Sequence, residues 1–198
     1  MFIELSEFLR CPEPHNETFC VVAPQDMRGR MIVRGLVGCP ICRREYPIED
    51  GVVKFGPAEW AERAERAEGA DPEAVWALLG LTGPGGFVVL VGSAAQLAPG
   101  LASRMDGVHL VAINPGRGWD PASAVSALTH PSRIPLRDAM ARGVVLGAES
   151  SLEPWVKEGT RVLLPGLRLV AAAEALSAPG LERLAAGKGL WVGRRSSL

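Results

Sequence analysis

The stretch FVVLVG, residues 87–92, decides the fold class of this chain. Five consecutive apolar residues without alternation are typical of a strand buried on both faces of a parallel sheet, and Gly92 ends the run. Further apolar segments follow at spacings that leave room for helices: 108–113, Ile134, 144–146, 161–164 and 167–170. This alternation predicts an α/β fold with a doubly wound, Rossmann-like parallel sheet covered by helices.

The segments that flank this region predict the domain organisation. Residues 58–68 are rich in Ala, Glu and Arg at helical spacing, and Asp71-Pro72 is a typical start of a second helix. After residue 170 the chain offers only a short segment and a last strand near 190–192, so we expect a truncated sheet without its terminal hairpin. The predicted division is a small N-terminal domain over 1–56, connecting helices over 57–80 and an α/β domain over 81–198.

All four cysteines lie near the start of the chain, and their spacing predicts a metal site. CPIC at residues 39–42 is a knuckle in which two intervening residues let a turn direct both thiolates at one ion. Cys11 and His15 form a second close pair. We therefore predict that Cys11, His15, Cys39 and Cys42 bind zinc, with Cys20 as the alternative to His15.

The surroundings of these residues favour a structural metal over a redox pair. Redox CxxC motifs open a helix, whereas turn residues and short strands surround this one. We expect strands over 19–23, 31–37, 45–48 and 52–55, joined by turns at 26–29 and 49–51. Cys20 lies in an apolar run, where a free thiol behaves as a small core residue. So small a β-hairpin module depends on its zinc for stability.

The segment CPICRREYPIEDGV, residues 39–52, resembles a known family: the small zinc-ribbon activator subunits of tRNA, rRNA and release-factor methyltransferases. The resemblance covers about residues 5–56. Family members have Cys-x2-Cys, then Tyr-Pro-Ile, then Asp-Gly-Ile or Asp-Gly-Val. Their first knuckle is Cys-Pro-x-Cys, where this chain has CPEPH at residues 11–15. The resemblance implies a zinc ribbon and a protein partner, either a methyltransferase or a translation-related protein.

The order of features over residues 72–195 resembles a class I S-adenosylmethionine-dependent methyltransferase domain. Four segments carry this resemblance: VVLVGSAA at 88–95, VHLVAIN at 108–114, IPLRDAMARGVVL at 134–146 and VKEGTRVL at 156–163. It implies that the nucleoside cofactor S-adenosylmethionine lies against the loop at Gly92, and that the residue after the second strand, Asn114, contacts its ribose.

This chain departs from that pattern at the positions that hold the cofactor. Leu90 stands where the family has an acidic residue, Gly92 is the only glycine left in the loop, and Asn114 replaces a carboxylate. Losing a charge-assisted hydrogen bond costs about 1.5–3 kcal/mol. Weakened S-adenosylmethionine binding is therefore predicted, with Gly92 and Asn114 as the remaining candidate contacts.

The sequence shows no pairing of acid and base or of nucleophile and base, so we predict no catalytic residue. His109 lies in an apolar run and is expected to be packed, and His130 stands in a loop. Asp138 and Glu149 are the carboxylates near expected strand ends, where helix capping or solvation is the ordinary role.

Composition limits the function classes. The chain has 198 residues, a net charge of −1 and 47% hydrophobic residues, which indicates a folded protein without the basic field that binds nucleic acid or membranes. No leader precedes an apolar stretch, and the longest apolar run, 83–95, is too short to span a bilayer, so we expect a cytoplasmic protein.

Three functions follow from these features. The first hypothesis is a zinc-binding protein whose methyltransferase-like domain is a pseudoenzyme, acting as a scaffold or activator-type partner. The alternative is an active small methyltransferase. The third is a nucleic-acid-binding ribbon, which rests on arginines of the first domain: Arg28, Arg30, Arg34, Arg43 and Arg44.

Overall fold

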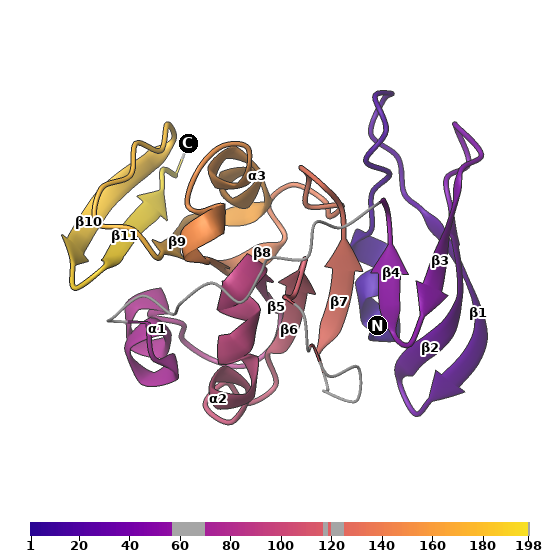
Figure 1. The fold of residues 1–198 in the computed structure, drawn as a ribbon, viewed down its shortest axis with the longest axis horizontal. Coiled ribbons are helices and arrows are strands. Elements are labelled where there is room, and N and C mark those ends of the chain that lie inside the picture. The colour runs from indigo at the N-terminus through magenta and orange to yellow at the C-terminus, as the bar shows by residue number, and fades with distance from the viewer. Residues whose placement is uncertain (57–69, 117–118, 120–124, 198) are drawn as a thin grey trace.

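The computed structural model describes residues 1–56, 70–116, 119 and 125–197 (Figure 1). The first predicted connecting helix, 58–68, and residues 117–118 of the loop after Asn114 lie outside the described residues. Among the described helices, none is both long enough and apolar enough to cross a membrane.

Five parallel strands form the centre of the molecule. The chain runs outward through β5, β6 and β7 and then returns to the other side of β5 for β8 and β9, which gives the order β7-β6-β5-β8-β9. These strands are β5 (Phe87–Val91), β6 (His109–Ile113), β7 (Ser126–Thr129), β8 (Ala141–Leu146) and β9 (Leu163–Ala171). The predicted α/β fold with a doubly wound parallel sheet is confirmed.

Both faces of this sheet are buried, as the unbroken apolar run of β5 predicts. Val89 and Val91 belong to one core cluster, together with residues of η1 (Ile3–Phe8) and α3 (Trp155–Val162). Val88 and Leu90 point to the opposite cluster, with residues of α1 (Pro72–Leu79) and α2 (Ala98–Ala102). Because successive strand residues face opposite sides, all of β5 must be apolar.

The helix predicted at Asp71-Pro72 is α1. The Asp71 side chain accepts a hydrogen bond from the Ala74 N–H at 2.9 Å, and Pro72 occupies the first turn, where its missing N–H costs nothing. Gly80 ends the helix in the left-handed conformation.

The first segment of the chain forms an antiparallel meander of four strands: β1 (Val21–Arg28), β2 (Met31–Gly38), β3 (Glu45–Glu49) and β4 (Val52–Lys54). The predicted first strand and its turn are placed too early. β1 continues to Arg28 and turns at Gly29 and Arg30, because register shifts near Pro24 and Asp26 let the strand run through residues typical of turns. Phe19 lies outside β1 and forms an isolated bridge with Arg10.

Within the described residues, the meander and the parallel strands belong to one sheet of eleven strands. β4 lies parallel to β7, with Val52, Val53 and Lys54 opposite Ala127, Leu128 and Thr129. Figure 1 shows the meander continuing the sheet beyond β7. The N-terminal metal-site segment is thereby fixed to the α/β half by backbone hydrogen bonds.

The other edge of the sheet carries a hairpin that corrects the expectation of a trimmed C-terminus. It consists of β10 (Leu181–Gly187) and β11 (Leu190–Arg195), and β11 inserts antiparallel between β9 and β10. β10 is almost entirely solvent-exposed, so its sequence, LERLAAG, lacks the apolar pattern by which a buried strand is recognised.

Candidate metal centre and the crevice of the parallel sheet

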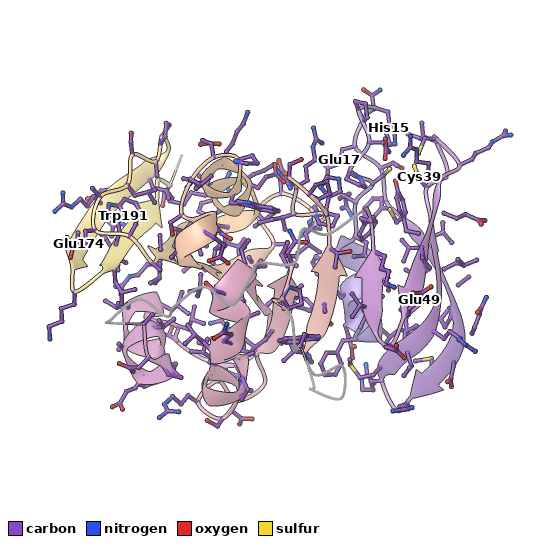
Figure 2. The ribbon with its side chains drawn as sticks, viewed as in Figure 1. His15, Glu17, Cys39, Glu49, Glu174 and Trp191 are labelled. Atoms are coloured by element: carbon purple, nitrogen blue, oxygen red, sulfur yellow. The ribbon has the colours of Figure 1, made fainter. Side chains whose placement is uncertain are left out.

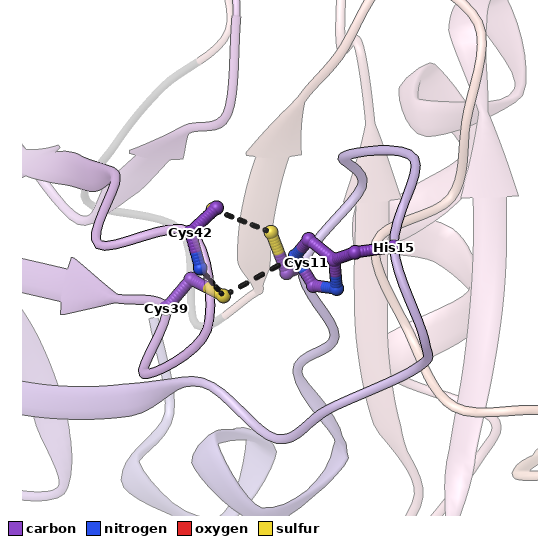
Figure 3. Close-up of side chains that lie close together, drawn as sticks. All are labelled: Cys11, His15, Cys39 and Cys42. Atoms are coloured by element: carbon purple, nitrogen blue, oxygen red, sulfur yellow. Dashed lines mark hydrogen bonds between the residues drawn. The ribbon is translucent and has the colours of Figure 1, made fainter.

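Cys11, His15, Cys39 and Cys42 converge at one end of the molecule (Figure 3). Their ligand atoms all lie within 4.8 Å of one another, with Cys11 Sγ 3.7 Å from Cys42 Sγ and Cys39 Sγ 3.4 Å from His15 Nε2. Zinc–sulfur bonds of about 2.3 Å in a tetrahedron place two sulfurs about 3.8 Å apart, whereas a disulfide needs about 2.05 Å. The four side chains therefore fit a zinc ion.

The knuckle orients its two cysteines through local backbone geometry. Arg43 adopts a positive φ of 59°, which turns the chain so that Cys39 N–H donates to the Arg44 carbonyl and Arg43 N–H to the Cys39 carbonyl. The Cys42 N–H points at Cys39 Sγ at 3.5 Å. Burial raises the pKa of the Cys39 thiol, but the N–H groups of Cys42 and Ile41 outweigh it, and the net pKa lies below its usual value. Cys39 is thus predisposed to be a thiolate.

The Cys11–His15 loop holds the histidine in the tautomer that binds metal. His15 Nδ1 lies 2.7 Å from the carbonyl oxygen of Asn16. A carbonyl only accepts, so the ring proton is assigned to Nδ1, which leaves the lone pair of Nε2 facing Cys39. Figure 2 places His15 and Cys39 together, far from Trp191 at the opposite end.

Cys20 lies outside this group of four. It is buried in the core, and its backbone N–H donates to the Leu9 carbonyl. Burial raises the pKa of the Cys20 thiol, as it does that of the Cys11 thiol, so only geometry separates them. The structure brings His15, and not Cys20, together with Cys11, Cys39 and Cys42.

Tyr46 is a neighbour of the metal ligands that the sequence did not single out. Its hydroxyl lies 3.5 Å from Cys11 Sγ and 3.4 Å from Glu13 Oε1, and its ring packs on Phe55 with centroids 4.7 Å apart. Burial raises the pKa of the Tyr46 hydroxyl, so it keeps its single proton, which it donates to Glu13 Oε1; the Cys11 sulfur lies within hydrogen-bond distance of the same hydroxyl.

We predict that Tyr46→Phe lowers zinc affinity about tenfold, because outer hydrogen bonds to metal ligands typically contribute 10- to 100-fold. The phenylalanine ring keeps the packing on Phe55, so thermal stability of the metal-loaded protein should change little. Competition with a chromophoric chelator measures the affinity. Equal affinities of variant and wild type would contradict a role for this hydroxyl.

Gly92 and Asn114 follow the paired strand ends Val91 and Ile113, at the carboxyl edge of the parallel sheet. The order of the strands reverses here, because β6 and β7 lie on one side of β5 whereas β8 and β9 lie on the other. Doubly wound sheets bind their ligands in the crevice at such a point. The two predicted cofactor contacts therefore lie where the fold would place a ligand.

Asn114 uses its side chain within the protein. Its Nδ2 donates to the His130 carbonyl at 2.7 Å, and its Oδ1 accepts from the His130 N–H at 2.9 Å. Both ends of the amide thus hold the chain after β7, in a residue that is itself buried with a positive φ of 48°. A ribose would have to compete with these two bonds.

His130 is held neutral by the same turn. Its Nδ1 accepts N–H bonds from Ser132 and Arg133, and burial, with repulsion from Arg133, lowers its pKa despite the opposite influence of Glu13 and Glu158. In the unfolded chain His130 binds a proton below about pH 6.5, whereas in the folded protein it does so only at lower pH. The free energy of unfolding is therefore highest above about pH 6.5 and decreases as the pH falls from there through the lower pKa of the folded state.

We predict that His130→Asn reduces this acid sensitivity. The Asn oxygen can accept the same turn N–H groups without titrating. Thermal unfolding from pH 8 to pH 5 should therefore give a wild-type midpoint that falls more steeply than that of the variant. Because the metal centre titrates in both proteins, the difference between the curves is the measurement, and parallel curves would contradict it.

Glu149 lies in this crevice, against Gly92. It belongs to η3 (Ala148–Ser150), directly after β8, and its carboxylate accepts bonds from the Ser93 N–H at 2.5 Å and the Ser93 hydroxyl at 2.7 Å. The carboxylate takes the space that a Cβ at Gly92 would need, so Glu149 would have to move before a nucleoside could lie against the Gly92 backbone. A separate cavity of about 20 Å³ lies beside Ser93 and Gly147, among apolar residues, and is lined by neither Gly92 nor Asn114.

His109 and Asp138, the other titratable residues noted in the sequence, contact side chains of the protein. The ring of His109 lies between those of Phe2 and Phe87, with centroids 4.6 and 5.6 Å away. Asp138 is paired with Arg161. A larger groove of about 450 Å³ runs between α1 and the β10–β11 hairpin, lined by apolar residues and Lys188 and by none of the predicted site residues.

Comparison with known proteins gives similar folds at low identity. No protein-family model and no curated protein matches the sequence significantly. One similar structure is a complex between the Haloferax volcanii Trm112 methyltransferase activator and a candidate methyltransferase, with 13% identity, a TM-score of 0.47, and 62% of this chain and 89% of that chain covered. A S-adenosylmethionine-dependent methyltransferase from Aquifex aeolicus has 19% identity, a TM-score of 0.46, and coverages of 65% and 90%. The antibiotic-resistance methyltransferase Kmr has 14% identity, a TM-score of 0.42, and coverages of 65% and 94%.

Proposed function

We propose that this protein is a zinc-stabilised scaffold in which a methyltransferase-like α/β half has lost cofactor binding and catalysis. The observation that carries the proposal is the state of the switch-point crevice. Glu149 lies against Gly92, at the point where a doubly wound fold binds its ligand, and both its carboxylate oxygens bond to Ser93. The amide of Asn114, bonded at both ends to His130, adds to this argument.

The zinc has a structural role in this proposal. Three sulfurs and one imidazole complete a four-coordinate shell, and structural sites are closed in this way, whereas catalytic sites keep one position for water or substrate. The ion would connect the loop over residues 11–15 to the knuckle over residues 39–42, because each segment supplies two of its four ligands.

The proposed activity is binding to a protein partner, either a methyltransferase or a translation-related protein. This partner class rests on the resemblance of residues 5–56 to methyltransferase activators. In this chain the ribbon is already paired through β4 with β7, so the ribbon and the α/β half would engage a partner as one unit.

Calorimetric titration of the zinc-loaded full chain with S-adenosylmethionine tests the proposal. We expect no binding stronger than about millimolar, since Glu149 lies against the Gly92 backbone and the Asn114 amide is bonded at both ends to His130. Micromolar affinity would overturn the proposed function and favour an active small methyltransferase. A methyl-transfer assay on tRNA, rRNA and protein fractions then separates binding from catalysis.

A further inference from the structure

Glu149 reaches across the junction of two strands that are adjacent in space and distant in sequence. β5 and β8 end in register, with Val91 opposite Leu146, and the Gly147 N–H donates to the Val91 carbonyl at 3.0 Å. From the segment after β8 the Glu149 side chain turns back to the first turn after β5, where both carboxylate oxygens bond to Ser93.

Two glycines make this contact possible. Gly92 has a φ of 63°, which favours glycine, and a Cβ built there would collide with the Glu149 carboxylate and the Ser150 hydroxyl. A Cβ at Gly147 would collide with the Ser93 side chain and backbone. The glycine of the loop that the resemblance assigns to the cofactor is therefore used here to admit a side chain of the same chain.

We propose that Glu149 is an internal plug, an autoinhibitory contact that keeps the switch-point crevice closed to nucleosides. This inference rests on the proposed function and names the residue responsible for it. The carboxylate satisfies the Ser93 donors that a ligand would otherwise approach, and its methylene groups occupy the adjoining volume. Closure is thus a property of one side chain and its two hydrogen bonds.

Two substitutions of Glu149 are expected to have different effects. Glu149→Ala removes the carboxylate and most of the side chain, which frees the Ser93 N–H and hydroxyl and enlarges the cavity. Glu149→Gln keeps the volume and an oxygen that can accept the Ser93 N–H bond, so the crevice stays closed. The glutamine variant is therefore the matched control.

The test is a titration of the zinc-loaded full chain with S-adenosylhomocysteine, the demethylated form of the cofactor, followed by calorimetry and by the thermal-unfolding midpoint. We expect the alanine variant to bind at least about tenfold more tightly than wild type, and the glutamine variant to match wild type. Zinc content and the midpoint without nucleoside check that each variant is folded.

The outcomes separate the two proposals. Micromolar binding by the wild type overturns the proposed function. If neither the wild type nor a folded alanine variant binds the nucleoside, the plug is overturned and the proposed function stands. If the alanine variant does not fold, Glu149→Ser shortens the same side chain so that it no longer reaches Ser93, and the same titration must then show a gain in affinity over wild type; no gain overturns the plug.

Discussion

Replacing Cys39 with alanine is expected to abolish stoichiometric zinc binding and to lower the unfolding midpoint by about 10 °C or more. Removing one of four ligands opens the shell, and metal-binding free energy in such modules is folding free energy. A loss of about 4 kcal/mol corresponds to about 8–16 °C in a domain of this size. Elemental analysis of the purified variant and differential scanning calorimetry measure the two effects.

Cys20→Ala is the matched control for this experiment. Cys20 is as buried as Cys11 but does not belong to the group of four ligand atoms. We expect it to keep full zinc content and to lose only the packing of one small side chain. The assignment of ligands fails if Cys20→Ala loses zinc, or if Cys39→Ala keeps a full equivalent.

The centre of the fold and the convergence of the four candidate metal ligands were predictable because their signals are local. The run FVVLVG has to be apolar throughout when both faces of β5 are buried, and a CPxC knuckle orients its thiolates within four residues. The position of His15 is also determined locally, since His15 stands close to Cys11 in sequence and its own loop turns it toward Cys39.

The strand β7 was not predicted because its sequence, SALT, has polar residues at both ends. Ser126 and Thr129 are nevertheless buried, and their hydroxyls bond to the Phe2 N–H and the Gly56 carbonyl. These partners lie 124 and 73 residues away in the chain. A buried polar strand can be recognised only once its partners are known.

Glu149 escaped prediction for the same reason. In sequence it is one carboxylate after an apolar strand, where capping or solvation is the ordinary role. Its partner, Ser93, lies 56 residues earlier, and the topology of the sheet alone brings β5 and β8 together. The departures at Leu90 and Asn114 indicated a weakened cofactor site, whereas the closing of that site follows from tertiary structure.

Arg161→Ala is expected to destabilise the protein by about 3 kcal/mol, a shift of about 6–12 °C in the unfolding midpoint. The guanidinium of Arg161 donates to the carboxylate of Glu158 and to the carbonyls of Ile134 and Leu136, and it pairs with Asp138. Removing it leaves a largely buried carboxylate without its cation, while the partial exposure of Arg161 limits the cost.

Arg194→Ala is the control, because Arg194 pairs with Glu182 at the exposed hairpin edge and such pairs contribute at most about 1 kcal/mol. Calorimetry should therefore separate the two variants clearly, and equal midpoints would contradict the role assigned to Arg161.

The same substitution should also weaken zinc binding, although Arg161 lies outside the metal centre. The carbonyls that it holds flank Pro135, whose own carbonyl accepts the Arg10 N–H at 3.0 Å, and Arg137 N–H donates to the Phe8 carbonyl at 2.8 Å. These bonds fix the extended segment that leads from η1 to Cys11. Chelator competition should show a loss of affinity for Arg161→Ala and none for Arg194→Ala, since only the first loosens the backbone that positions a ligand.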